Sequence, residues 1–322
     1  MKYFWNLCIC IFFIFSSCHK GNLPENETRE KEKWRIISLA PSTTKILEKL
    51  NLTQHLVATD KFSETEKKTI NIGGFLDPNY ELITEINPTH IIGLKSHSRI
   101  KEKLNFLNSK WILGKAENIE DYFHTFEKIG KEFGKKETAQ KHINETKKTF
   151  NSFTEMASLK IQCDLTKPEN CPERKKILIV ISRKRGETTN ILAASKKTFI
   201  SEIIEMLGAE NAVKYNEESV NPYWPNLSPE SIIEINPDEI WEFGELRKDQ
   251  ELCCKIGSYF YPYLKMKTVN AVQEKSFKLF EDKNLTIPGP NIEETLKFFA
   301  IELYPSYQKE IENLINPAKS RP

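Results

Sequence analysis

A twelve-residue segment that occurs twice is the strongest constraint on the fold of this chain. ELITEINPTHII at 81–92 aligns with ESIIEINPDEIW at 230–241, an offset of 149 residues, and seven of the twelve positions are identical. Each copy predicts an amphipathic helix that ends at Asn-Pro, since the residue before a proline avoids the α region, followed by a buried strand. The repetition therefore indicates two α/β lobes of related topology.

The apolar pattern around the two copies predicts further α/β units with parallel strands. In the N-terminal half it predicts strands at 35–40, 56–60 and 111–114 and helices at 42–50 and 99–108. In the C-terminal half it predicts strands at 176–182 and 277–280 and helices at 199–207 and 292–303. Between the halves, apolar residues spaced three or four apart from 119 to about 153 predict one long helix, or two abutting ones.

The N-terminal residues have the pattern of a secretion signal. Lys2 is followed by an apolar run at 7–15, far shorter than the roughly 20 residues that a membrane-spanning helix needs. The small residues before Cys18 resemble the lipobox of bacterial lipoproteins, although Phe15 stands where that pattern has an aliphatic residue. We expect a signal peptide at 1–17, a lipidated Cys18 and a polar tether to residue 33. An ordinary signal peptide with chance cysteines is the alternative.

Composition excludes several classes of protein. The chain has 322 residues, more than one typical domain needs. A mean hydropathy of −0.51 excludes a polytopic membrane protein. The formal net charge of +2 gives no broad attraction to nucleic acid or to an anionic membrane.

Together with the repeat and the long helical segment, these exclusions lead us to expect a lobe at 34–117, a linking helix at 118–158 and a lobe at 159–322. We expect this protein to be exported and to be held at a membrane only by the lipid.

The cysteines suggest disulfides more than a metal site. Beyond the lipidated Cys18, four cysteines remain, and in an oxidising compartment Cys163 and Cys171 could close a small loop. The pairing of Cys253 and Cys254 stays open. No cysteine or histidine spacing suits zinc, and the G-x-S-x-G, H-E-x-x-H and G-x-G-x-x-G motifs are all absent from the sequence. The sequence thus predicts neither a metal site nor an enzyme.

A family resemblance covers nearly the whole chain after the tether. It is carried, in order, by IISLAPSTT at 36–44, GGFLDPNYELITEINP at 73–88, KTFISEIIEMLGAENAV at 197–213, SPESIIEINPDEI at 228–240 and PGPNIEETL at 288–296. Together these segments resemble the solute-binding proteins of bacterial ABC importers for cobalamin and ferric siderophores. The resemblance implies two Rossmann-like lobes with parallel sheets, joined by a long rigid helix. It also implies a monomer without a cofactor that binds a large ligand between the lobes and delivers it to a membrane permease.

Several loop residues are candidates for ligand contact. Ser42 and Thr43 follow a strand and open a helix, where N–H and hydroxyl groups can receive a polar ligand group, although plain N-capping explains them as well. Aromatic side chains can form walls around a large flat ligand, and loop packing is the alternative for each. The aromatic candidates are Phe62, Phe75, Tyr223, Trp224 and Phe243.

Charge in the predicted cleft helps to rank the ligands. Arg183 follows the strand at 176–182, at the edge of the sheet where ligands gather, so it could neutralise an acidic ligand or lie in a solvated turn. The PGPR segment of the family reads PGPN here, with Asn291 in place of arginine. The missing arginine and the aromatics favour cobalamin over a ferric siderophore or haem. An enzyme on the same scaffold and a surface adhesion lipoprotein are the alternatives of other classes.

Glu81 and Glu230 occupy equivalent positions in the two copies of the repeat, in the first turn of each helix. Favourable interaction with the helix dipole is sufficient to explain acids there. The resemblance implies a second role, because in this family one surface glutamate of each lobe pairs with arginines of the permease. We therefore predict that Glu81 and Glu230 are the docking residues.

Overall fold

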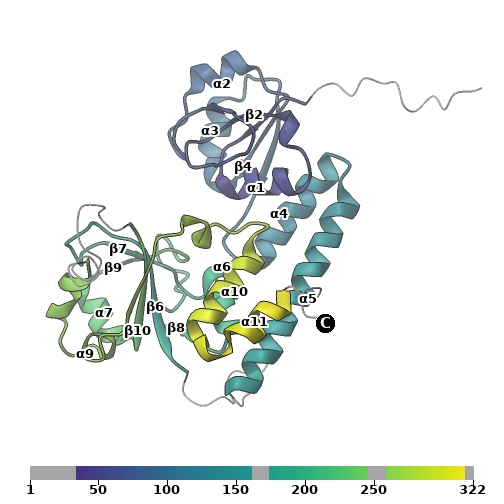
Figure 1. Cartoon of the computed structure of the whole chain (residues 1–322). Helices are drawn as coiled ribbons and strands as arrows, with labels where there is room; N and C mark the ends of the chain where they lie inside the picture. The colour runs from purple at the N-terminus through teal and green to yellow at the C-terminus, as the bar shows by residue number, and fades with distance from the viewer. Residues whose placement is uncertain (1–33, 162–173, 246–258, 316–322) are drawn as a thin grey trace, which may run out of the picture. The chain divides into compact units, whose positions relative to one another are not determined.

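The computed structural model describes residues 34–161, 174–245 and 259–315 (Figure 1). The predicted signal peptide and tether, the lipidation site Cys18, and the disulfide candidates Cys163 and Cys171 lie outside these residues. In the described part of the chain, no helix has the length and apolar character needed to cross a membrane.

The N-terminal lobe is built on a five-stranded parallel sheet in the order β3-β2-β1-β4-β5. Its strands are β1 (Ile36–Ser38), β2 (Leu56–Thr59), β3 (Ile70–Asn71), β4 (His90–Leu94) and β5 (Lys110–Gly114). Its helices are α1 (Pro41–Lys49), α2 (Tyr80–Ile86) and α3 (Ser98–Lys103), with short 3₁₀ turns η1 (Thr53–His55) and η2 (Lys95–His97). The chain moves outward from β1 to β3 and returns on the other side of β1 at β4. This reversal places a switch point at the carboxyl ends of β1 and β4, where open α/β sheets bind ligands.

The C-terminal lobe has a mixed six-stranded sheet, so the prediction of a wholly parallel second sheet is wrong. Strands β10 and β11, and β6 with β8 and β10, are parallel, whereas β7 pairs antiparallel with β6 and β9. The connection from β6 to β7 at 183–190 is too short for the crossover that a parallel partner requires. The strands are β6 (Lys176–Ser182), β7 (Ile191–Ala193), β8 (Glu210–Asn211), β9 (Asn226–Leu227), β10 (Glu239–Phe243) and β11 (Phe277–Phe280).

The helices of this lobe surround the sheet and extend to the end of the described chain (Figure 1). They are α6 (Phe199–Met206), α7 (Pro229–Ile235), α9 (Asn270–Gln273), α10 (Ile292–Leu303) and α11 (Gln308–Ile315). Short 3₁₀ turns are η4 (Tyr261–Lys265), η5 (Lys283–Thr286) and η6 (Pro305–Tyr307). The α/β fold class with two sheets is therefore confirmed.

The connector between the sheets consists of two helices, α4 (Ile119–Glu132) and the 26-residue α5 (Lys136–Ile161), which pack side by side (Figure 1). The break falls at Gly134, which has a φ of 66° that few other residues adopt. Gly130 explains the close packing, because a Cβ there would lie 2.7 Å from the Cβ of Ala139. The prediction left one helix or two open, and the structure has two.

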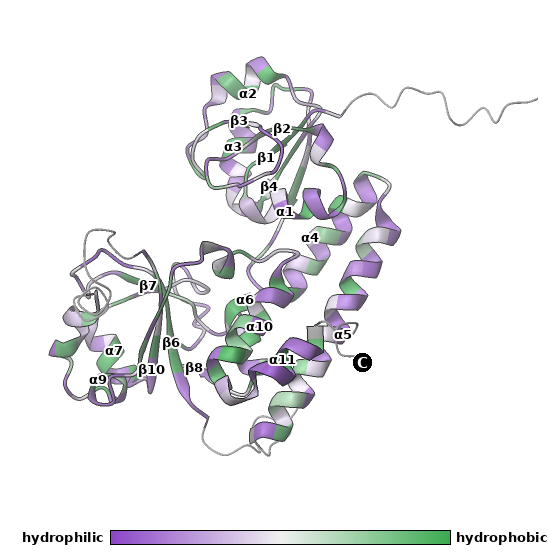
Figure 2. Cartoon of the chain, viewed as in Figure 1, coloured by the Kyte–Doolittle hydropathy of each residue, from purple (hydrophilic) through white to green (hydrophobic). Residues whose placement is uncertain are grey.

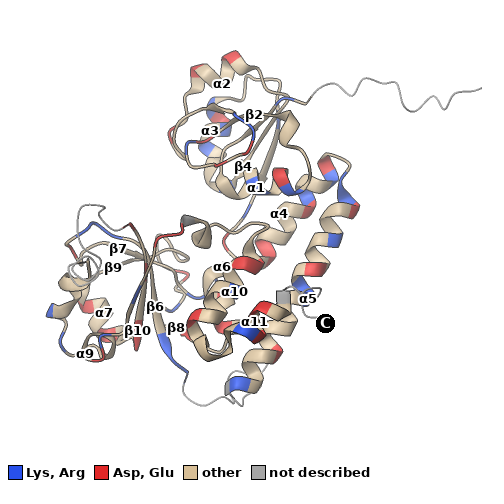
Figure 3. Ribbon diagram, in the orientation of Figure 1, with Lys and Arg blue, Asp and Glu red and all other residues tan. Residues whose placement is uncertain are grey.

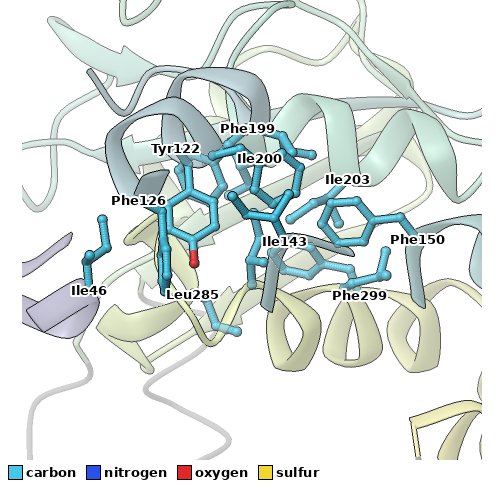
Figure 4. Packing of buried hydrophobic residues seen from close by; sticks show 14 of the residues in the cluster. Ile46, Tyr122, Phe126, Ile143, Phe150, Phe199, Ile200, Ile203, Leu285 and Phe299 are labelled. Atoms are coloured by element: carbon cyan, nitrogen blue, oxygen red, sulfur yellow. The ribbon is translucent and has the colours of Figure 1, made fainter. Parts of the chain in front are cut away.

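One apolar core runs from α1 through the connector to α6 and α10. Figure 4 shows Ile46 of α1, Tyr122 of α4, Ile143 of α5 and Phe299 of α10 within this cluster. Each fully buried side chain of this size contributes about 1.5–3 kcal/mol. The strands of both sheets are largely hydrophobic, while the exposed faces of α4 and α5 are polar (Figure 2). The connector is thus anchored along its length by burial.

Both copies of the repeat form the same helix–strand unit, α2–β4 and α7–β10. The N-caps are equivalent, since the side chains of Asn79 and Ser228 accept hydrogen bonds from backbone N–H groups at 2.9 and 3.2 Å. Each helix ends at the asparagine before proline, and Asn87 and Asn236 have left-handed φ values of 47° and 45°. The predicted stop is confirmed, and it uses the left-handed conformation that asparagine tolerates.

Replacing these two asparagines with alanine should destabilise the protein unequally. Asn87→Ala removes the short polar side chain that lets asparagine tolerate the left-handed region, and it should cost about 1 kcal/mol. Asn236→Ala should cost about 2 kcal/mol, because the Asn236 side chain also accepts a 2.8 Å hydrogen bond from the Asn270 N–H. Urea unfolding measures both, with Asn87→Gly as the control that keeps the conformation. Equal losses in Asn87→Gly and Asn87→Ala would contradict the explanation.

Candidate functional site

The loops after β1, β2, β3 and β4 all leave the N-terminal sheet at the same edge, the one formed by the carboxyl ends of the strands, because these strands are parallel. The loop after β2 carries Phe62, whose side chain is 56% exposed, and the loop after β3 carries Leu76, which is 66% exposed. Lys61 and Lys95 are exposed at the same edge. The ammonium of Lys61 lies 4.9 Å from the centre of the Phe62 ring. This edge therefore combines exposed apolar surface with positive charge.

Ser42 and Thr43 lie inside the lobe. Ser42 is 4% exposed and Thr43 is fully buried. The Thr43 hydroxyl donates to the Ala40 carbonyl oxygen at 2.9 Å and lies 2.8 Å from the Ser38 hydroxyl. The N-cap of α1 is Ala40, which makes no side-chain cap hydrogen bond. The hydroxyl of Thr43 thus joins β1 to α1. The Thr43 side chain neither caps α1 nor is open to a ligand.

Phe75 packs edge-on against His97, with ring centroids 4.4 Å apart. His97 is fully buried, and burial lowers its pKa to about 4, so the ring is neutral near pH 7. Its Nδ1 accepts a 2.9 Å hydrogen bond from the Leu94 N–H, so the proton of the neutral ring is on Nε2. A metal-ligating histidine usually donates its second ring N–H to a partner. In this arrangement His97 supports Phe75 and does not offer a nitrogen to a metal.

The turn before Phe75 has no room for ligand at its glycines. A Cβ on Gly74 would lie 1.9 Å from Oδ1 of Asp77, so the Asp77 side chain occupies that side of the turn. Gly73 has a φ of 98°, which the turn requires. The glycine pair, which suggested close approach of a ligand, therefore serves the turn itself.

The loop with Tyr223 and Trp224 is held on both sides. Ser195 donates from its N–H to the Tyr223 carbonyl oxygen at 2.9 Å and from its hydroxyl to the Pro222 carbonyl oxygen at 2.6 Å. The indole Nε1 of Trp224 donates to Oε2 of Glu117 at 2.8 Å. Trp224 is half-buried against the main core. Trp224 therefore lies where the chain leaves β5 for α4, beside a glutamate that carried no sequence signal.

Tyr223 packs against a neighbouring aromatic ring. Its ring centroid lies 5.2 Å from that of Tyr215, at a tilt of 62°. Desolvation, with a smaller contribution from Tyr215, raises the pKa of Tyr223 to about 12. The phenol therefore stays protonated and can donate a hydrogen bond at physiological pH.

Phe243 belongs to the core, contrary to the prediction that it faces a cleft. It ends β10, is 7% exposed, and packs against Phe280 and Phe299 with ring centroids 5.4 and 6.3 Å away. The end of a strand indicates the edge of the sheet but not the face on which a side chain lies. Phe243 lies on the face that α10 covers.

Arg183 is also buried, and all its contacts are within the protein. Its side chain is 0% exposed and its Nε lies 2.8 Å from Oε1 of Glu242. The two terminal nitrogens donate to the carbonyl oxygens of Tyr259 and Glu187 at 2.7 and 3.2 Å. The hydroxyls of Tyr259 and Tyr263 donate to the Glu242 carboxylate at 2.9 and 3.1 Å. The prediction that Arg183 neutralises a ligand conflicts with this geometry, because its charge is already balanced.

The PGPN segment lies beside the N-terminal lobe. A Cβ on Gly289 would be 3.5 Å from the Cβ of Lys45 in α1. Asn291 is exposed at the N-cap position of α10. The position where the family has arginine is thus at the surface, and it carries no charge in this chain.

Glu81 and Glu230 are both exposed, each the second residue of its helix. Hydrogen bonds from its own backbone and from Ser228 lower the pKa of Glu230. Acidic residues occur on α2 and α7 within a mixed distribution of charge (Figure 3). Among the described residues, no ion pair joins either glutamate to a basic side chain of the protein. The described residues also contain no group of three or more His, Cys, Asp or Glu placed to hold a metal.

Comparison with known proteins agrees with this fold. The family described as periplasmic binding protein matches residues 36–250, more than half of the chain. The high-affinity heme uptake system protein IsdE of Staphylococcus aureus (strain Newman) is 23% identical over 250 residues, which cover 74% of this chain and 76% of IsdE.

Solved structures give the same result. The structure of S. aureus IsdE complexed with heme has a TM-score of 0.64 and 19% identity, covering 84% of this chain and 99% of that one. The periplasmic heme-binding protein HutB of Vibrio cholerae has a TM-score of 0.65 and 20% identity, covering 85% of this chain and 100% of HutB. The chain belongs to the periplasmic binding protein family.

Proposed function

We propose that this protein captures haem, or a closely related iron tetrapyrrole, and delivers it to the permease of its importer. The observation that carries the proposal is the exposed apolar and basic edge of the N-terminal sheet, at Phe62, Leu76, Lys61 and Lys95. Relatives named for haem uptake and haem binding support the choice of ligand.

The charge of this edge favours haem over the cobalamin that the sequence suggested. Haem is a flat apolar ring with two propionates, whereas the corrin ring of cobalamin carries uncharged amide side chains. An aromatic wall contributes apolar contact, and an exposed ammonium can form a charge-assisted hydrogen bond with a propionate. Phe62 and Lys61 offer both together. Cobalamin remains the second candidate, because Trp224 and Phe62 would suit either ring.

The iron at the centre of the haem ring would need an axial ligand of its own. Of the histidines that the structure describes, only His97 lies in a loop at this edge, and its Nδ1 is occupied by the Leu94 N–H. His97 therefore has no axial role. Phe62, Phe75 and Trp224 contact the ring, whereas Arg183 and Phe243 do not contact the ligand.

Removing the Phe62 ring should weaken haem binding about tenfold, corresponding to about 1.4 kcal/mol. The protein would be titrated with haemin, with binding measured by Soret absorbance, and with cyanocobalamin in parallel. Phe106→Ala is a matched control, because Phe106 is 66% exposed but lies in the turn before β5, at the opposite edge of the sheet. Binding of cyanocobalamin and not of haemin would replace haem with the second candidate. Equal losses of haemin affinity in Phe62→Ala and Phe106→Ala would exclude this edge of the sheet as the ligand site.

We also propose that Glu81 and Glu230 dock the protein onto the permease, one at each lobe. Their equivalent positions, their exposure and the absence of a basic partner among the described residues support this role. Attachment through a lipid on Cys18, a position on the periplasmic side of a membrane, and a monomeric state complete the proposed arrangement.

A further inference from the structure

Glu117 occupies a short connection that the sequence did not single out. It lies between β5 and α4, and both its backbone and its side chain bind the C-terminal lobe. The Glu117 carbonyl oxygen accepts a 2.8 Å hydrogen bond from the N–H of Phe199, the first residue of α6. Its carboxylate accepts the 2.8 Å hydrogen bond from the Trp224 indole. One residue therefore fixes a helix start and an aromatic ring.

A second carboxylate holds the same connection from the opposite direction. Oε2 of Glu202, in α6, accepts a 2.8 Å hydrogen bond from the N–H of Ile119, the first residue of α4. Burial raises the pKa of Glu202, and the Ile119 N–H opposes this shift. The starts of α4 and α6 are thus joined by two reciprocal bonds, so the backbone of Glu117 has a defined position.

The loop of Trp224 is equally well defined. The Ala193 N–H donates to the Pro225 carbonyl oxygen at 3.0 Å, and the Trp224 N–H donates to Oδ1 of Asn221 at 3.3 Å. With the backbone held, the remaining freedom of Trp224 is rotation of its side chain. The bond to Glu117 selects one orientation of the indole, which is half-buried.

We propose that Glu117 is a positioning residue that holds the Trp224 indole as a preformed wall of the ligand site. An aromatic wall that is already ordered loses less conformational freedom when a ligand packs against it. The ligand part of this inference rests on the proposed function, whereas the positioning of the indole does not. Glu117 acts through Trp224 and needs no contact of its own with the ligand.

The positioning is tested first without ligand. Subtracting the emission spectrum of Trp224→Phe from that of the parent isolates the Trp224 signal. Glu117→Ala should shift this signal to longer wavelength and increase its quenching by acrylamide. Glu117→Gln should restore the parent signal, because the amide oxygen still accepts from the indole. Glu155→Ala, which removes an exposed acid from α5, is the matched control. Unchanged quenching in Glu117→Ala would overturn the proposal.

The contribution to binding is tested by a double-mutant cycle with haemin. Glu117→Ala should weaken binding about fivefold, mainly through faster dissociation, and Glu117→Gln should remain near the parent. In the Trp224→Phe background, Glu117→Ala should cause no further loss. Additive losses would show that Glu117 acts independently of Trp224 and overturn the assignment. A parent protein that binds neither haemin nor cyanocobalamin would instead refute the proposed function, while the quenching result would still decide the role of Glu117.

Discussion

Replacing Arg183 with methionine should lower the free energy of unfolding by about 3–5 kcal/mol, because it leaves the buried carboxylate of Glu242 without its cation. The two tyrosine hydroxyls that remain bound to Glu242 cannot balance a full charge. Urea unfolding at pH 7.5 measures the loss. Lys184→Met is a matched control on the next residue, because the pair of Lys184 with Glu187 is on the surface, and its removal should leave the unfolding midpoint nearly unchanged.

The loss in Arg183→Met should depend on pH. Burial raises the pKa of Glu242 above its usual value of 4.5, and the charge of Arg183 opposes this shift. Without Arg183 the pKa of the folded state rises further, so the folded protein binds more protons than the unfolded chain as pH increases through 4.5. Stability is then lost as pH rises. We expect a smaller loss at pH 5 than at pH 7.5, and substantial recovery in the double variant Arg183→Met/Glu242→Leu. A pH-independent loss would contradict this account.

Reversing charge at both ends of the proposed docking surface should abolish import. Glu81→Lys/Glu230→Lys should reduce uptake by reconstituted vesicles containing the permease about a hundredfold or more, because each lysine would face a basic partner. The affinity for haemin should be unchanged, since neither residue is at the proposed ligand site. The measurement is haemin uptake driven by ATP, with affinity determined separately by absorbance.

A matched control applies the same change of charge elsewhere on each lobe. Glu102 in α3 and Glu274 after α9 are both exposed, so Glu102→Lys/Glu274→Lys adds the same charge away from α2 and α7. This control should retain uptake. Loss of haemin affinity in Glu81→Lys/Glu230→Lys, or full uptake by it, would show that the docking assignment is wrong.

The parts of the fold that sequence predicts well are those with a strong local signal. Strand β6 is an unbroken apolar run, and the two Asn-Pro stops fix the ends of α2 and α7. Strands β7 and β9 have three and two residues, too few to show a period, so their antiparallel pairing was missed. The break at Gly134 was undecided because the spacing of apolar residues continues across it.

The site is less predictable because its side chains are placed by residues distant in sequence. Arg183 was a candidate for ligand contact because it follows β6, but its partner Glu242 lies on β10, and only the pairing of these strands brings the two together. Glu117 was missed for a similar reason, as Trp224 is 107 positions away. By contrast, Phe62 follows a predicted strand, and the edge of the sheet could be inferred from that alone.

The bonds that Glu117 makes to the C-terminal lobe have a consequence for unloading. Swinging the N-terminal lobe outward would draw the connection at 115–118 away from the C-terminal lobe and would leave the Phe199 N–H and the Trp224 indole N–H without their acceptors on Glu117, at about 1–3 kcal/mol for each group left unsatisfied. We therefore expect the two lobes to separate only rarely without a partner, so that a bound ligand is retained. Under the proposed function, ligand release would then be driven by the ATP-dependent cycle of the permease.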